Sequence, residues 1–166
     1  FRRQVSGPEK AKVLETLHEL LSSPAPPRPE INFGTHVLAT RKRLKIESGK
    51  EWREIGVLAA SGYRVGVKDG VTEAVRRKIL NHIFLDDDLS DVEDLVYAQE
   101  WGDRKTGPRL KKIADSLATF AKNAKRNSYV NYDVAISEWE ADLKYLKKTF
   151  YDNWGGFPWP RSEEHT

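Results

Sequence analysis

The sequence predicts a mostly α-helical fold, a single compact bundle of about six helices. Three observations support this prediction. Helix-start patterns of the form Ser-x-x-Glu occur at residues 6–9, 48–51 and 90–93. Apolar residues recur at spacings of three and four in the segments that follow. Little of the chain alternates between apolar and polar residues with the period of two that is typical of strands.

Composition limits the class of protein. The 166 residues suit one domain with an extension, and 28 basic against 25 acidic side chains leave a net charge of only +3. The chain has no cysteine, which excludes disulfides and thiolate metal sites and fits a cytoplasmic protein. It also has no methionine, so we interpret it as a fragment or a processed product. No apolar run reaches the length of about twenty residues that spans a membrane.

The chain divides by pattern into four parts. Residues 1–23 form an N-terminal helical arm, with a helix expected from the first capping box to about Ser22. Residues 24–30 form a proline-rich linker that cannot be helical. The main helical domain is expected at residues 31–152. An aromatic, partly irregular tail follows at 153–166.

The first half of the main domain is ambiguous. Thr35 is positioned to cap a helix over residues 36–44, but a short β-hairpin near 31–46 or 63–67 also fits the pattern. The second capping box predicts a helix from about residue 51 that ends at Gly62.

Residues 62–84 form the stretch around which the rest of the domain is expected to be organised. Gly62, Gly66 and Gly70 predict a turn-rich loop. Thr72 is positioned to cap the helix that follows. This helix carries three adjacent cations at 76–78, which cannot all lie on one face.

Three further helices complete the domain. The third capping box predicts a helix that ends at Gly102, and Thr106 opens a strongly amphipathic helix over residues 107–126. The last helix is expected at 133–151, capped by Asn131, with Trp139 and Leu143 in the core. Asp142 lies at the edge of its apolar stripe and therefore needs a partner, for which Arg76, Arg77 or Arg109 would serve.

No catalytic motif is present. The chain contains no Walker loop, GxGxxG, HExxH or GxSxG pattern, and its four histidines are scattered. Three adjacent carboxylates at 86–88 lack the spacing of a calcium loop, so we expect a solvated loop there. The sequence therefore predicts no catalytic residues, no metal and no cofactor. A nuclease-type fragment with loosely spaced carboxylates stays open as an alternative.

The pattern GYRVG, then GVTExxRRKIL, then WExDLKYL resembles an uncharacterised helical accessory module of larger bacterial proteins. The resemblance covers roughly residues 58–151 and implies a compact helical module without an assigned activity. The residues that carry it are Gly62, Tyr63, Val65, Gly70, Arg76, Ile79, Leu80, Trp139, Asp142 and Leu143.

Clustered cations give the functional prediction. Lysine and arginine on helix faces are the usual contacts of nucleic-acid phosphates, and tyrosines in nearby loops can stack on bases. We therefore expect a non-catalytic nucleic-acid-binding module, with DNA favoured over RNA. A protein-interaction or assembly module, acting through the proline-rich linker or the aromatic tail, is the alternative. The predicted nucleic-acid contacts are Arg41, Arg43, Tyr63, Arg76, Arg77, Lys111, Lys122 and Arg126.

Overall fold

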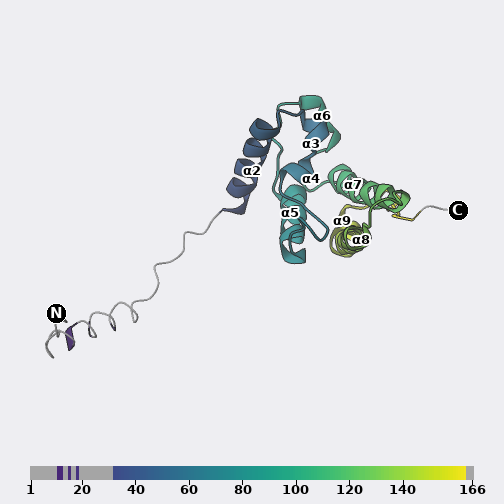
Figure 1. Cartoon of the computed structure of the whole chain (residues 1–166). Coiled ribbons are helices and arrows are strands. Elements are labelled where there is room, and N and C mark those ends of the chain that lie inside the picture. Colours follow the sequence, from purple (N-terminus) through teal and green to yellow (C-terminus); the bar gives the residue numbers. More distant parts are fainter. Residues whose placement is uncertain (1–10, 13–14, 16–17, 19–31, 164–166) are drawn as a thin grey trace. The chain divides into compact units, whose positions relative to one another are not determined.

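The computed structural model describes residues 11, 12, 15, 18 and 32–163, and the chain divides into two units at Ile31/Asn32. The four described residues of the first unit are helical and exposed. The remaining sequence predictions for the N-terminal arm and the linker lie outside the described residues. The second unit contains the helices labelled in Figure 1.

Helix α2, Phe33–Ser48, begins where the side chain of Asn32 accepts a hydrogen bond from the backbone N–H of Thr35. The helix is polar on most of its surface, and only Val37 and Arg41 are fully buried. It occupies the region where a strand pair had been considered. The described part of the chain contains no strand, so the hairpin prediction is wrong at both of its suggested positions.

The helix expected from residue 51 to Gly62 is broken in two. Helix α3, Trp52–Ile55, and helix α4, Val57–Ala60, are separated by Gly56, whose φ of 76° is left-handed. The break leaves the backbone N–H of Val57 without a helical acceptor. The hydroxyl of Tyr97, from the short helix α6 (Leu95–Glu100), accepts it at 3.1 Å.

Helices α5 and α7 begin as the sequence predicts. Thr72 caps α5, Glu73–Leu85, and Thr106 caps α7, Gly107–Arg126. Both helices contribute fully buried apolar side chains to the core, among them Leu80, Ile83, Leu110 and Leu117. Helix α6 instead starts later than its predicted capping box, because Asp94 accepts from the N–H of Tyr97 at 2.9 Å.

Helix α8, Asp133–Leu146, packs along α7 in the most extensive helix contact of the second unit. It continues into a π-helical turn, η1 (Lys147–Tyr151), and a short helix α9, Asp152–Trp154. The wide turn changes the angular position of the residues after it. Phe150 and Trp154 thus both contact Phe84, at ring-centroid distances of 4.6 and 5.4 Å.

The aromatic tail folds back on the core. Trp154, Phe157 and Trp159 are half-buried and pack against the main hydrophobic cluster. Tyr151 contacts the rings of Phe157 and Trp159 edge-on and donates a hydrogen bond to the carbonyl of Phe157. Much of the aromatic surface in the tail is therefore covered by the chain itself.

Candidate groove and its polar supports

The glycine loop, residues 62–72, is held against α8 by a buried polar cluster. We call Tyr63, Arg76, Glu138 and Asp142 the Arg76 cluster. The Oδ2 atom of Asp142 accepts from the hydroxyl of Tyr63 at 2.6 Å and from Nε of Arg76 at 2.7 Å. Arg76 also donates to Glu138 and to the carbonyl of Val71, both at 3.0 Å. These bonds tie the two ends of the loop to one carboxylate pair.

Glu138 secures the middle of the same loop. Its Oε2 atom accepts the backbone N–H of Gly66 at 2.7 Å. Asp142 is completely buried, and its Oδ1 atom has no hydrogen-bond partner among the described residues. A buried carboxylate oxygen without a partner is costly, so Asp142 depends on the two bonds to its other oxygen.

The cluster fixes its own protonation state. Burial, and then the negative charge of Asp142, raise the pKa of Tyr63 far above its ordinary value, so its hydroxyl remains a donor. Burial lowers the pKa of Arg76, but its hydrogen bond to Asp142 and the charges of Asp142 and Glu138 outweigh this and raise the pKa above its ordinary value. Arg76 is therefore a buried cation with two carboxylate partners.

A second buried cluster holds the first residue of the turn formed by residues 61–63, and the Arg76 cluster holds the last. We call Arg41, Ser61, Asp87 and Asp91 the Arg41 cluster. Arg41 donates to Oγ of Ser61 at 3.0 and 2.8 Å, to Asp91 at 3.1 Å, and to both oxygens of Asp87. Ser61 and Tyr63 are separated only by Gly62, whose φ is 89°. The turn 61–63 therefore joins α2, through Arg41, to α8, through Asp142.

Arg109 is the third buried arginine. Among the described residues its guanidinium donates only to backbone carbonyls, those of Ile83, Asp87, Trp101 and Gly102. These carbonyls lie at the ends of α5 and α6, where helical acceptors are left without donors. Burial lowers the pKa of Arg109.

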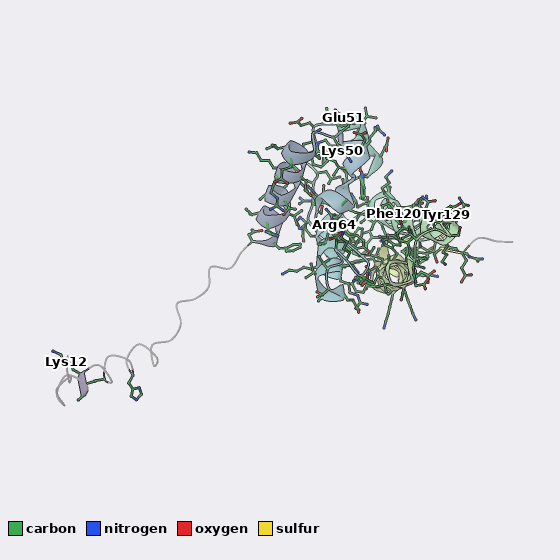
Figure 2. All side chains as sticks on the ribbon, in the orientation of Figure 1. Lys12, Lys50, Glu51, Arg64, Phe120 and Tyr129 are labelled. Atoms are coloured by element: carbon green, nitrogen blue, oxygen red, sulfur yellow. The ribbon has the colours of Figure 1, made fainter. Side chains whose placement is uncertain are left out.

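A groove with two lobes runs beside the glycine loop. The first lobe, of about 530 Å³, lies between the α3–α4 segment and α7, and its walls include Tyr97, Trp101 and Phe120. The second lobe, of about 750 Å³, lies between the glycine loop and the start of α8. Val65 and Trp139 line both lobes, so the two are neighbours that share these side chains. Figure 2 labels Arg64 and Phe120 of the first lobe.

The rim of the groove is partly open and apolar. Phe120 is 41% exposed, Val134 45% and Val67 88%, and each lines one of the lobes. Trp139, expected in the core, is half-buried between the core and the groove, whereas Leu143 is buried as expected. The prediction that Trp139 faces the core was correct, but its side chain is less deeply buried than expected.

Charges around the groove nearly balance. Arg53, Arg64, Lys112 and Lys68 line it together with Glu54, Asp69 and Asp133. Arg53 and Lys112 both pair with Glu100, at 2.6 and 3.6 Å. The hydrogen bond from Arg53 lowers the pKa of Glu100, which keeps that carboxylate ionised. The groove therefore presents an aromatic surface with compensated charge on one side.

The structure separates the predicted nucleic-acid contacts into two groups. Arg41, Tyr63 and Arg76 are buried in the two clusters and cannot reach a phosphate or a base. The structure places these three side chains in the interior and not on a binding surface, because they donate hydrogen bonds to the buried carboxylates of Asp87 and Asp142. Arg77 is half-buried, pairs with Glu73 and lies over the ring of Tyr145 at 4.6 Å.

The other four predicted contacts stay at or near the surface. Arg43 is exposed and lies 4.0 Å from Glu47, and Lys111 pairs with Asp115 on its own helix. Lys122 is half-buried and Arg126 is exposed. The structure does not bring these side chains together in one pocket with Arg41 or Arg76, since those two are enclosed in separate clusters.

Some functional features escaped the sequence analysis. The groove was not predicted, because Phe120 falls on the apolar face of α7 like its buried neighbours and only packing shows that it is exposed. Asp87 was expected in a solvated loop but is buried against Arg41. The need of Asp142 for a partner was predicted, and Arg76 among its three named candidates is that partner.

Within the described ranges, no group of three or more His, Asp or Glu side chains is arranged to hold a metal ion. No helix of these ranges has the length and apolar character needed to cross a bilayer. No protein family, no curated protein and no solved structure matches the chain. The resemblance to a bacterial accessory module therefore stays a prediction.

Proposed function

We propose that this chain is a non-catalytic protein-interaction module whose two-lobed groove holds an extended segment of a partner protein. The observation that carries this proposal is the open, aromatic groove with Phe120 and Val67 exposed at its rim. Apolar side chains gathered around a groove are typical of interaction sites. Each lobe has the volume of an ordinary ligand site.

The placement of the cations favours a protein partner over a nucleic acid. A phosphate backbone requires several cations that are free to exchange their counterions. Here Arg41 and Arg76 are buried in ion pairs, while Arg77, Lys111, Lys112 and Lys125 pair with carboxylates. Paired cations beside an apolar groove are better suited to a polypeptide.

The elongated shape favours an extended peptide. The two lobes share Val65 and Trp139 in their linings, so a segment long enough to cover both would pass over these side chains. Extended segments place alternate side chains on opposite sides, which lets every second residue enter the groove.

A displayed library of random ten-residue peptides tests the proposal. Selection on the purified chain is expected to yield binders that lose about 5- to 30-fold in affinity with Phe120→Ala, since a half-exposed aromatic anchor contributes about 1–2 kcal/mol. Tyr129→Ala is the matched control, because Tyr129 is 96% exposed and does not line the groove. Figure 2 labels both aromatic residues.

Both variants are expected to keep the melting temperature of the parent within a few degrees, because both side chains are exposed. Selected peptides that bind Phe120→Ala and the parent equally would contradict the groove as the binding site. A selection without any specific binder would contradict the proposed function.

Nucleic-acid binding is the second candidate, and the exposure of Arg43 and Arg126 favours it. Fluorescence anisotropy with labelled duplex and single-stranded oligonucleotides at two salt concentrations tests it. Binding that weakens with salt and with the double variant Lys122→Glu/Arg126→Glu would support this candidate. Equal binding by the double variant would exclude these residues as phosphate contacts.

The nuclease-type alternative has less support. Its catalytic core requires a mixed sheet to position the carboxylates, and the described ranges are helical without strands. Glu47 and Asp69, two carboxylates with a basic residue a few positions later, lie on α2 and on the glycine loop, and neither belongs to a metal-binding group in the described ranges.

A further inference from the structure

Arg64 differs from the other cations of the first lobe. Its guanidinium donates to the backbone carbonyls of Ala59, at 2.8 Å, and Tyr63, at 3.1 Å. Neither partner carries a charge. Arg53 and Lys112, which line the same lobe, share the carboxylate of Glu100 instead. Within residues 32–163, Arg64 forms no ion pair, so its positive charge is uncompensated.

Arg64 also has a fixed position. It is half-buried, and its two bonds hold the guanidinium at the end of α4, on the segment that enters the glycine loop. A guanidinium has five N–H donors, and the two carbonyl bonds use only its NH1 nitrogen. Donors remain for a carboxylate, which arginine binds with two parallel hydrogen bonds.

The aromatic walls lie beside this charge. Phe120 and Trp139 line the same lobe as Arg64 and contribute apolar surface to it. We infer that the partner segment inserts a large apolar side chain against Phe120 and Trp139 and places the carboxylate of an adjacent Asp or Glu on Arg64. This inference rests on the proposed function and names the chemistry of its ligand.

A single carboxylate suits the site better than a polyanion. The groove lining also carries Glu54, Asp69 and Asp133, which repel a chain of phosphates. One carboxylate on Arg64 adds one negative charge where one positive charge is uncompensated. Because Arg64 is half-buried, this pair is stronger than a fully exposed one.

The test repeats the random ten-residue peptide selection on the parent chain and on Arg64→Gln. Peptides selected on the parent are expected to be enriched in Asp or Glu adjacent to Phe, Trp or Leu, and this enrichment is expected to be absent on Arg64→Gln. Gln removes the charge and keeps a polar amide donor at this position. Lys50→Gln is the matched control, because Lys50 is exposed and lies outside the groove lining.

One selected peptide and its Glu→Gln version then give the affinity of the pair by fluorescence anisotropy. The parent and Lys50→Gln are expected to prefer the acidic peptide about tenfold, as for a charged hydrogen bond of about 1.4 kcal/mol. Arg64→Gln is expected to lose this preference, and Arg64→Lys to recover part of it. The Arg64→Lys variant keeps the test valid if Arg64→Gln proves unstable.

The outcomes separate the inference from the proposed function. Binders that depend on Phe120 but show no acidic enrichment would overturn the inference and leave the interaction module in place. Absence of any binder that depends on Phe120 would overturn both. Oligonucleotide binding that requires Arg64 would overturn the inference in favour of the nucleic-acid candidate.

Discussion

The Arg41 cluster and the Arg76 cluster are similar in chemistry, but we expect the loss of the arginine to cost a different amount of stability in each. Each joins a buried arginine to a buried aspartate, a second partly exposed carboxylate and one hydroxyl. In the Arg41 cluster both oxygens of Asp87 have partners, and the backbone N–H of Leu89 supplies one at 3.0 Å. In the Arg76 cluster one oxygen of Asp142 has none among the described residues.

This difference shows that two ion pairs with equal burial can depend on their arginine to different degrees. Without its arginine each aspartate would keep one hydrogen bond, from the N–H of Leu89 to Asp87 or from the hydroxyl of Tyr63 to Asp142. Asp87 would in addition keep the nearby positive charge of Arg109. The Arg76 cluster is also the one that holds the wall of the groove, through Gly66 and Tyr63. Stability and groove geometry are therefore linked on the α8 side of the turn.

Arg76→Met is expected to give the largest effect, a loss of about 3–5 kcal/mol in the free energy of unfolding, because it leaves the Asp142 carboxylate unpaired in the core. Arg41→Met is the comparison and is expected to cost less, since Asp87 retains the nearby charge of Arg109 as well as the N–H of Leu89. Urea denaturation of both variants measures the difference. Equal losses would mean that the charge of Arg109 does not stabilise Asp87.

A double variant sharpens the same comparison. Arg76→Met/Asp142→Leu removes the buried charge together with its partner and is expected to recover much of the lost stability. Val71 and Glu138 still lose their bonds to Arg76, so the recovery stays incomplete. A double variant no more stable than Arg76→Met alone would show that the cost comes from lost packing.

Gly62→Ala is expected to cost about 1–2 kcal/mol, because a left-handed residue at φ of 89° must be strained or the turn must shift. No atom would contact the added methyl group, so the cost is one of backbone conformation. Ser61 and Tyr63 are held by the two clusters, which prevents relaxation. Thermal denaturation against Gly49→Ala provides the check.

Gly49 is the matched control for this position. Its φ is 62°, it likewise has open space around it, and its neighbours Ser48 and Lys50 are exposed. We expect Gly49→Ala to cost less, because the end of α2 can relax. Equal costs would indicate that the clusters do not stiffen the turn at 61–63.

The sequence predicted the positions of the helices better than it predicted which of their charged side chains are buried. Thr72 and Thr106 cap helices because a hydroxyl next to an apolar repeat is a local signal. Gly56 was not recognised as a break, because the break is stabilised by a hydrogen bond from Val57 to Tyr97, forty positions after Val57. The burial of Arg41, Arg76 and Arg109 depends on carboxylates and carbonyls brought together by the fold, and no local spacing encodes it.

Arg76 and Arg77 show this limit at adjacent positions. One is enclosed with Asp142, and the other lies half-exposed over Tyr145, because the 100° step of the helix turns them to different neighbours. The groove was unpredictable for the same reason. Phe120 shares its helical face with Leu117 and Ala121, and only the position of the facing segment leaves it uncovered.

Alkaline pH is expected to lower the free energy of unfolding in part through Tyr63 of the Arg76 cluster. In the unfolded chain Tyr63 loses its proton near pH 10, whereas burial and Asp142 raise its pKa in the folded chain. The folded state then binds the extra proton, so the free energy of unfolding falls as pH rises above 10, by up to about 1.4 kcal/mol per pH unit. Below pH 10 this contribution is fully present.

Urea denaturation of the parent and Tyr63→Phe at pH 9, 10 and 11 measures this contribution. Lysines also titrate in this range, and the variant retains them, so the difference in slope reports Tyr63. We expect the variant to lose less stability between pH 10 and 11 than the parent does. Equal losses of stability in the parent and the variant would show that titration of the Tyr63 hydroxyl does not contribute to the pH dependence.

The smallest expected effect is at the surface. Lys125 pairs with Glu140 between α7 and α8, but both side chains are about one-third exposed, at 32% and 39%. Water screens such a pair and the long lysine loses side-chain freedom to form it, so Lys125→Ala is expected to cost about 0–1 kcal/mol. Lys111→Ala, which removes a pair with Asp115 within α7, is the matched control and should cost a similar amount.

Added salt should shrink both losses, whereas the cost of Arg76→Met should barely respond, because buried charges are weakly screened. Urea denaturation at low and high salt measures these losses. A loss for Lys125→Ala as large as that for Arg76→Met would contradict the distinction between buried and surface cations.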